Sequence, residues 1–152
     1  MLYAKKLHLL LGKWTGSEKI SSFEYFEETE FNWDKHNDLI HYEQRTWDKK
    51  TGLPLHWESG FIKPIDSEGV DHFEISNAQD SGRVEILKGR YSKDKNIHRL
   101  HLNSKVLAND SRMVMSERIF AIDNNKLSYI MKMSTNNIEE HQQHLKAELI
   151  KI

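Results

Sequence analysis

Apolar and polar residues alternate along the chain from Gly12 almost to its end, and this alternation restricts the folds that the chain can adopt. In the run 23–31, the odd-numbered positions include Phe23, Tyr25 and Phe31, while glutamates occupy most of the even-numbered positions. Successive side chains of a β-strand point to opposite faces, so a period of two predicts strands with one covered face and one solvated face. Antiparallel sheets contain strands of this kind, which makes an all-β fold the first prediction.

Short polar segments separate the alternating runs and have the composition of tight turns, as in Asp80-Ser81-Gly82 and Asp123-Asn124-Asn125. They divide the chain into about ten predicted strands, at 13–17, 23–31, 38–47, 54–63, 70–76, 83–91, 97–107, 112–122, 126–133 and 139–150. Regular short strands are typical of an up-and-down barrel or a sandwich, and the lack of a long connection favours the barrel. We therefore predict an all-β, calycin-like, antiparallel up-and-down β-barrel of about ten strands. A short N-terminal helix at 2–11 precedes it, with Leu2, Lys6, Leu9 and Leu10 on one side.

Length and composition limit the function classes. A chain of 152 residues favours one domain, spanning 1–152, whose core is large enough to be stable without disulfides or structural metals. The net charge of −1 and the lack of a long basic run argue against a nucleic-acid partner. No segment approaches the ~20 apolar residues of a membrane helix, and no signal peptide is recognisable, so we expect a soluble, cytoplasmic protein without a membrane partner. The lack of cysteine excludes disulfides, thiolate metal sites and cysteine nucleophiles. Nucleophile elbows, phosphate loops and dinucleotide fingerprints are also missing, which removes the usual hydrolase, kinase and dehydrogenase classes.

A closed barrel of this size predicts a bound small molecule. Eight strands already leave room for one small ligand in lipocalins, and about ten strands enclose more space than the side chains fill. Four methionines lie in pairs on two successive predicted strands, and we expect them, with Phe61 and Leu100, to form a soft apolar ligand wall; the pairs are Met113 with Met115 and Met131 with Met133. Core packing is the commoner role for any one methionine. Charged residues such as Glu43, Arg45 and Glu58 are better interpreted as cross-strand ion pairs.

One histidine, His144, stands beside an apolar alternation in the last predicted strand. Neutral imidazole is the commonest protein ligand for metals and a usual one for haem iron. Strict pleating, however, puts Leu145, Ala147 and Leu149 on one face and His144 on the other. Either the strand bulges near His144, so that the histidine also points inward, or the leucine face is covered from outside by the N-terminal segment or a partner subunit.

Six segments along the chain carry a resemblance to a known family: 10–16 (LLGKWTG), 23–28 (FEYFEE), 41–48 (HYEQRTWD), 55–61 (LHWESGF), 77–86 (NAQDSGRVEI) and 144–149 (HLKAEL). Taken in this order, they resemble the nitrobindin family over nearly the whole chain. The resemblance implies a ten-stranded, lipocalin-like or fatty-acid-binding-protein-like barrel that binds haem b at one mouth. It implies that His144 is the axial metal ligand and that His56 lies near the cofactor. Family members bind nitric oxide and isomerise peroxynitrite to nitrate, which makes this chain a candidate haem-dependent peroxynitrite isomerase, although no catalytic side chain is assigned.

The chain departs from the family pattern at one loop. Where the family has a glycine-rich loop ending in Tyr-Pro-Thr-Ile, this chain has Ser17-Glu18-Lys19-Ile20. Lys19 replaces the threonine that approaches the haem in the family, and its ammonium either reaches a haem propionate or lies in water. Two alternatives therefore stay open at this point. The barrel binds an apolar small molecule without haem, or it serves as an interaction module or structural subunit whose exposed apolar strand faces form a homodimer.

Overall fold

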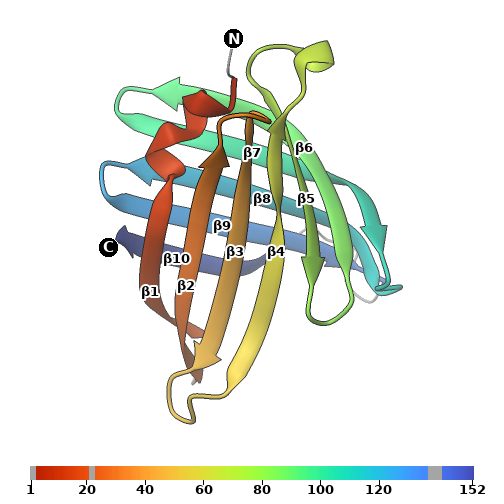
Figure 1. Ribbon diagram of the computed structural model, residues 1–152. Coiled ribbons are helices and arrows are strands. Elements are labelled where there is room, and N and C mark those ends of the chain that lie inside the picture. Colours follow the sequence, from red (N-terminus) through yellow and green to blue (C-terminus); the bar gives the residue numbers. More distant parts are fainter. Residues whose placement is uncertain (1–2, 21–22, 137–141) are drawn as a thin grey trace.

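The structure is a computed structural model that describes residues 3–20, 23–136 and 142–152. For residues 3, 19, 20, 23, 66 and 142–144 the description covers the backbone and not the side chain. Ten antiparallel strands close into a barrel in the order β1-β10-β9-β8-β7-β6-β5-β4-β3-β2 (Figure 1). Every strand pairs with its neighbours in sequence, and β1 pairs with β10 to close the ring. The predicted up-and-down barrel is confirmed.

The elements follow the predicted runs with shifted ends. They are η1 (Tyr3–Leu10), β1 (Gly12–Ile20), β2 (Phe23–Asp34), β3 (Leu39–Asp48), β4 (Pro54–Pro64), η2 (Asp66–Glu68), β5 (His72–Gln79), β6 (Val84–Asp94), β7 (Ile97–Ala108), β8 (Met113–Asp123), β9 (Lys126–Thr135) and β10 (Gln142–Lys151). The first predicted strand, 13–17, is too short, because the ladder with β2 continues to the pair Ile20↔Phe23. Residues 139–141 of the last predicted run lie outside the described residues. None of the described helices is long and apolar enough to cross a membrane.

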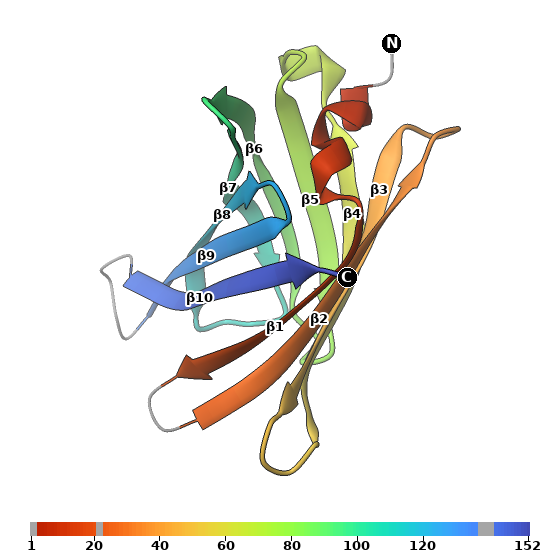
Figure 2. The same cartoon turned by 90° about the vertical axis from the view of Figure 1, so that its left-hand side faces the viewer.

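The N-terminal segment forms a 3-10 helix, and it covers one end of the barrel (Figures 1 and 2). The face predicted for it was wrong. Ala4, Leu7 and Leu10 are buried, whereas Lys6 forms an ion pair of 2.5 Å with Asp71. The segment consists of 3-10 turns on either side of a kink at Leu7, where φ is −94° and ψ is 21°, so the α-helical spacing behind the predicted face does not apply.

The end of the barrel beneath η1 is closed by apolar side chains. Trp14 is fully buried there, and its indole Nε1 donates a hydrogen bond of 2.7 Å to the carbonyl oxygen of Leu10. Large buried residues from the surrounding strands complete this core, among them Ile40, Ile62, Phe73, Leu87, Leu100, Leu102, Leu127 and Leu149. The opposite end, where the β1–β2, β3–β4, β5–β6, β7–β8 and β9–β10 connections lie, is here called the mouth.

The seam between β1 and β10 is short. Its register pairs are Trp14↔Lys151 and Thr15↔Ile150, both near the closed end. Toward the mouth, the Glu18 carboxylate accepts a hydrogen bond of 2.6 Å from the backbone N–H of Glu148. A side chain therefore takes the place of ladder hydrogen bonds on the mouth side of this seam, and the two strands diverge in Figure 2.

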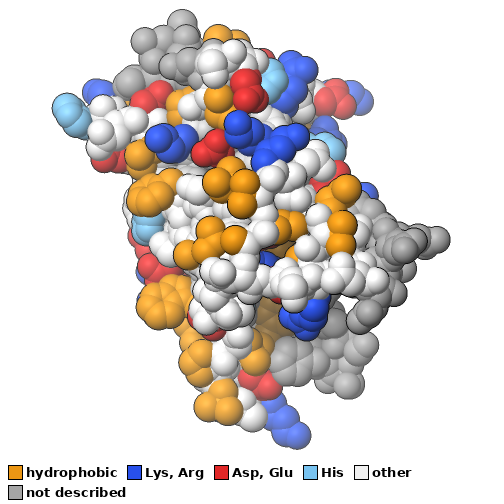
Figure 3. All heavy atoms as spheres, turned by 90° about the vertical axis from the view of Figure 1, so that its right-hand side faces the viewer, with side chains coloured by type: hydrophobic (Ala, Val, Ile, Leu, Met, Phe, Trp, Pro, Cys, Tyr) orange, Lys and Arg blue, Asp and Glu red, His pale blue; other side chains and the backbone are white. Residues whose placement is uncertain are grey.

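The outer face of the barrel carries exposed apolar side chains among charged ones, as the view in Figure 3 shows. They include Leu53, Leu55, Trp57 and Phe61. Arg45 covers part of this surface, because its guanidinium lies 4.3 Å from the centre of the Trp57 ring.

Gly89 on β6 tests how tightly the barrel is packed. A Cβ at this position would lie 1.7 Å from the carbonyl oxygen of His101, on the neighbouring strand β7. We expect Gly89→Ala to lower the free energy of unfolding by about 1–3 kcal/mol, since it forces the backbone apart. Urea denaturation monitored by tryptophan fluorescence measures this loss. The exposed Ser92→Ala on the same strand is the control, and equal stability of the two variants would contradict the packing.

Candidate functional site

The middle of the lumen is polar. Buried side chains at inward-facing positions include Glu27, Thr29, Gln44, Glu58, Asn77, Glu85, Ser116 and Arg118. The sequence analysis did not predict this layer, because it interpreted the charged residues as ion pairs between neighbouring strands. The alternation could have revealed it. Glu27 and Phe31 both occupy odd-numbered positions of β2, so their side chains point to the same face, and both line the cavity in the lumen.

Arg118 joins three strands of the barrel wall. From β8, its guanidinium donates to Glu58 on β4 at 2.8 and 3.2 Å, and to Glu85 on β6 at 2.8 Å. The Tyr42 hydroxyl donates to Glu58 at 2.5 Å, and the Ser116 hydroxyl donates to Glu85 at 2.9 Å. Burial alone would raise the pKa of the Glu58 carboxyl, but the Arg118 charge and the hydrogen bonds from His56, Arg118 and Tyr42 hold this pKa well below its usual range.

Glu27 lies in a different environment on β2. The Tyr129 hydroxyl donates to its Oε1, while Thr29 Oγ1 and Gln44 Nε2 donate to its Oε2 at 2.8 and 3.0 Å. Burial raises the pKa of the Glu27 carboxyl; these hydrogen bonds oppose the rise, and the Glu58 charge adds to it. The pKa values of the two buried glutamates, Glu27 and Glu58, are therefore shifted in opposite directions.

The lumen is filled by the protein's own side chains at this level. The cavity between the polar layer and the apolar end measures about 20 Å³, the room of a single water molecule. It is lined by residues that include Glu27, Arg118, Phe120 and Tyr129. The expectation of a hollow interior that needs a filler is too simple, because polar side chains occupy the middle. A ligand larger than water has its place at the mouth.

The mouth has one apolar wall. Met131 is buried on β9, and Met133 on β9 and Leu145 on β10 pack against the core. The two methionines of β9 therefore face the interior, and their contact with a ligand stays a prediction. Met115 is 44% exposed, because an irregular register between Met113 and Met115 breaks the alternation of β8.

Two other residues predicted around the ligand lie elsewhere. Phe61 is 45% exposed on the outer face, where its ring lies 5.3 Å from that of His41. The neighbouring Ile62 takes the inward position in its place, as the alternation of β4 requires. Leu100 is buried, but it belongs to the core cluster rather than to the mouth.

The strand β10 bulges at His144. Lys132 and Met131 are consecutive on β9 and pair with Gln143 and Leu145, so His144 is the extra residue of β10. This irregularity is the one that an inward-pointing His144 requires if Leu145, Ala147 and Leu149 also face inward. The side chain of His144 lies outside the described residues, so its role as ligand stays a prediction.

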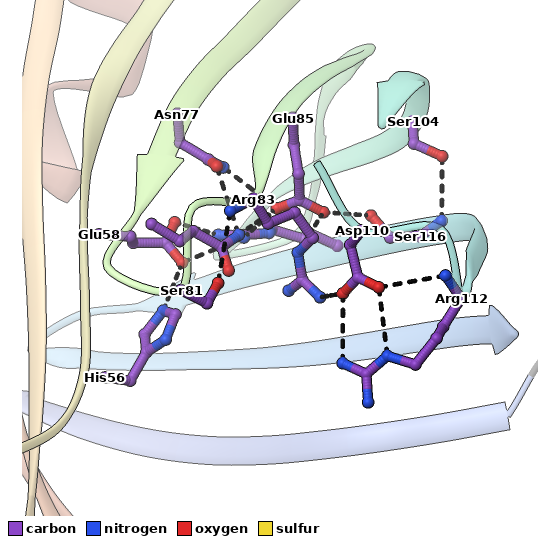
Figure 4. A network of polar contacts seen from close by, with 12 residues as sticks. His56, Glu58, Asn77, Ser81, Arg83, Glu85, Ser104, Asp110, Arg112 and Ser116 are labelled. Carbon is purple, nitrogen blue, oxygen red and sulfur yellow. Dashed lines mark hydrogen bonds and ion pairs between the residues drawn. The ribbon is translucent and has the colours of Figure 1, made fainter. Parts of the chain in front are cut away.

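His56 lies at the rim of the mouth and contacts the buried ion cluster. Its Nε2 is 2.9 Å from Glu58 Oε1, and its Nδ1 is 3.7 Å from Asp80 Oδ1 (Figure 4). The backbone of Lys19 pairs with Glu24 between β1 and β2, and its side chain lies outside the described residues. The structure therefore brings His56 to the mouth and leaves Lys19 and His144 as predictions.

A buried hydroxyl at the mouth lacks a hydrogen-bond partner. Tyr25 shares the inward face of β2 with Glu27 and is only 3% exposed, yet its hydroxyl contacts no acceptor among the described residues. Leaving such a group unpaired costs about 1–3 kcal/mol. An apolar wall, a bulge at a histidine and an unpaired donor fit a flat apolar cofactor that carries anionic groups, such as haem.

A barrel with one closed end and an open, partly apolar mouth defines the class of ligand-binding β-barrels. Residues 4–151 match the family model of the THAP4-like, heme-binding beta-barrel domain. The chain belongs to this family of haem-binding barrels, and haem is its expected cofactor.

Proteins of known name and structure resemble the chain over almost its full length. The protein named peroxynitrite isomerase Rv2717c from Arabidopsis thaliana is 36% identical over 99% of this chain and 89% of its own length. Peroxynitrite isomerase 1 from Mycobacterium tuberculosis (strain H37Rv) is 32% identical over 92% of this chain and 89% of its own length. The crystal structure of Rv2717c from M. tuberculosis superimposes with a TM-score of 0.85 at 28% identity, covering 100% of this chain and 98% of that one.

Breaking the Arg118 cluster should destabilise the fold. We expect Arg118→Met to cost about 3–5 kcal/mol of unfolding free energy near neutral pH. It removes the guanidinium from buried Glu58 and leaves buried Glu85 with only the more distant Arg83, 3.9 Å away. The loss should shrink as the pH falls below the usual carboxyl range, where these carboxyls become protonated. Urea denaturation at several pH values measures it. Arg112→Met, at a mostly exposed arginine that pairs with Asp110, serves as the control and should change little.

The Glu27 carboxyl should produce the opposite pH dependence. A pKa raised in the folded state contributes stability below the usual carboxyl range, and this contribution is lost as the pH rises through the folded-state pKa. We therefore expect the stability of Glu27→Gln, measured relative to the unchanged protein, to increase between pH 4 and pH 8. Thermal unfolding across this range tests the sign, and a relative stability that falls with pH would contradict the environment assigned to Glu27.

Proposed function

We propose that the protein binds haem b at the mouth, that the imidazole of His144 is the axial ligand of the iron, and that the loaded protein isomerises peroxynitrite to nitrate. The observation that carries the proposal is the bulge of β10 at His144. In a haem-binding barrel, this bulge lets a histidine share the inward face with Leu145 and Ala147. The names of the relatives, peroxynitrite isomerase, support the reaction.

The side chains of the mouth have separate tasks in this proposal. Met131, Met133 and Leu145 bind the ring plane and exclude water, because thioether and leucine side chains adapt to a flat apolar surface. His56 contributes a polar group at the rim that Glu58 holds in place. Lys19, on β1, pairs its ammonium with a propionate. When bound, the haem supplies the iron chemistry, and the protein sets the axial ligand, the polarity and the access.

The polar layer supports the same function from below. It fills the lumen so tightly that only about 20 Å³ stays open, so the cofactor cannot slide toward the closed end. The Arg118–Glu58–Glu85 cluster gives this floor a fixed shape, since it joins β4, β6 and β8 through short hydrogen bonds. A rigid floor holds the ring at a fixed depth beside the bulge.

Titration of the purified protein with haemin tests the proposal. We expect the unchanged protein to give a sharpened Soret band, and His144→Ala to lose the spectrum of histidine-bound iron together with the accelerated decay of peroxynitrite to nitrate. His101→Ala is the matched control, because His101 is exposed and contacts Glu117. A spectrum of free haemin for the unchanged protein would overturn haem binding. Retention of the spectrum by His144→Ala would overturn the ligand assignment.

A further inference from the structure

Three tyrosines of the described residues are buried along the lumen, and they differ in their hydroxyl partners. Tyr42 donates to Glu58 at 2.5 Å, and Tyr129 donates to Glu27. Tyr25 is the one nearest the mouth, and its hydroxyl contacts no acceptor within the part of the chain that the structure describes. Two of the three hydroxyls are therefore paired with a carboxylate, and the third points into the lumen unpaired.

The carboxylates nearest Tyr25 are already engaged. Glu27, two positions along the same face, accepts hydrogen bonds from Tyr129, Thr29 and Gln44. Glu18, the register partner of Tyr25 on β1, accepts from the backbone N–H of Glu148 through its Oε1. These two carboxylates thus have other donors, and the described residues leave the Tyr25 hydroxyl free to donate to a molecule that enters the mouth.

The Tyr25 hydroxyl is kept as a donor by its surroundings. Burial raises its pKa, and the charges of Glu27 and Glu18 raise it further, so the phenol stays protonated near neutral pH.

We propose that the Tyr25 hydroxyl donates a hydrogen bond to an anionic oxygen of the ligand in the mouth, and that Tyr25 thereby selects haem with free carboxylates or an oxygen-bearing iron ligand. The inference rests on the proposed haem binding and extends it to a residue on β2, on a different strand from His144. The shared chemistry is an anionic oxygen, which comes either from a haem propionate or from a small ligand on the iron. Tyr42 and Tyr129 show the same pairing inside the protein.

The first arm of the test compares haemin with haemin dimethyl ester, whose propionates cannot carry charge. If the propionate is the acceptor, the unchanged protein should bind haemin roughly 10- to 100-fold more tightly than the ester, as hydrogen bonds to charged groups allow. Tyr25→Phe should reduce this preference to the part that the Lys19 ammonium contributes. Tyr91→Phe is the matched control, because the Tyr91 hydroxyl contacts His98 at 2.7 Å, away from the mouth, and should leave the ratio unchanged.

The second arm detects an acceptor on the iron. The C–O stretching band of the ferrous carbonyl complex should shift to higher frequency in Tyr25→Phe, because a hydrogen-bond donor near the bound ligand is removed. A shift without loss of ester discrimination assigns the contact to the iron side, and loss of discrimination without a shift assigns it to the propionate. Equal affinity ratios and equal stretching bands in both proteins would overturn the proposal.

The unliganded protein provides a third readout. Tyr25→Phe should unfold at the same temperature as the unchanged protein or higher without haemin, since the hydroxyl removed is unpaired there. A purely structural role would instead lower the unfolding temperature. If the unchanged protein fails to bind haemin at all, haem binding itself fails, and this outcome differs from a Tyr25→Phe variant that binds haemin and its ester as the unchanged protein does.

Discussion

The buried contact of Arg118 with Glu58 and Glu85 organises the barrel. A guanidinium without a partner cannot remain in an apolar interior, and neither can two carboxylates. Here one cation from β8 satisfies both anions, which come from β4 and β6 on other parts of the wall. The contact spans 60 residues of sequence to Glu58, so it forms only when β4 and β8 face each other across the lumen. Unlike apolar packing, it requires a specific pairing of charged groups from three strands.

The polar layer also divides the barrel into two parts with different tasks. Above it, Trp14 and the surrounding aliphatic residues form a dry core beneath η1. Below it, the mouth combines an apolar wall on β9 and β10 with polar groups on β2 and β4. The first part holds most of the buried apolar side chains, and the second is where we propose that haem binds. Among the described residues, the buried donor without a partner, the Tyr25 hydroxyl, belongs to the second part.

The alternation of the sequence predicted the number, order and closure of the strands, because each run needs only local side-chain periodicity. Local periodicity also held the positions of Glu27 and Glu58. Their partners, however, lie far along the chain, Tyr129 for Glu27 and Arg118 for Glu58, and no local pattern predicts these contacts. The face of η1 was mispredicted since propensity does not distinguish a 3-10 helix from a short α-helix. Phe61 was predicted to face the ligand because it is apolar. In the structure its neighbour Ile62 faces inward, so the alternation of the strand turns Phe61 outward. The sequence analysis named a bulge at His144 only as one of two open alternatives, the one in which the histidine points inward. The register of β10 against β9 shows that the bulge is present.

The seam between β1 and β10 has a consequence for how a cofactor arrives. Because ladder pairing there is limited to Trp14 and Thr15, the mouthward half of β10 is held by fewer backbone hydrogen bonds than any strand pair that runs its full length. Local opening of a protein begins where such bonds are fewest. The strand that carries His144 thus borders the seam of the barrel that opens most readily. Opening of this seam would widen the mouth beside β10 while the Arg118 cluster, which joins β4, β6 and β8, stays intact.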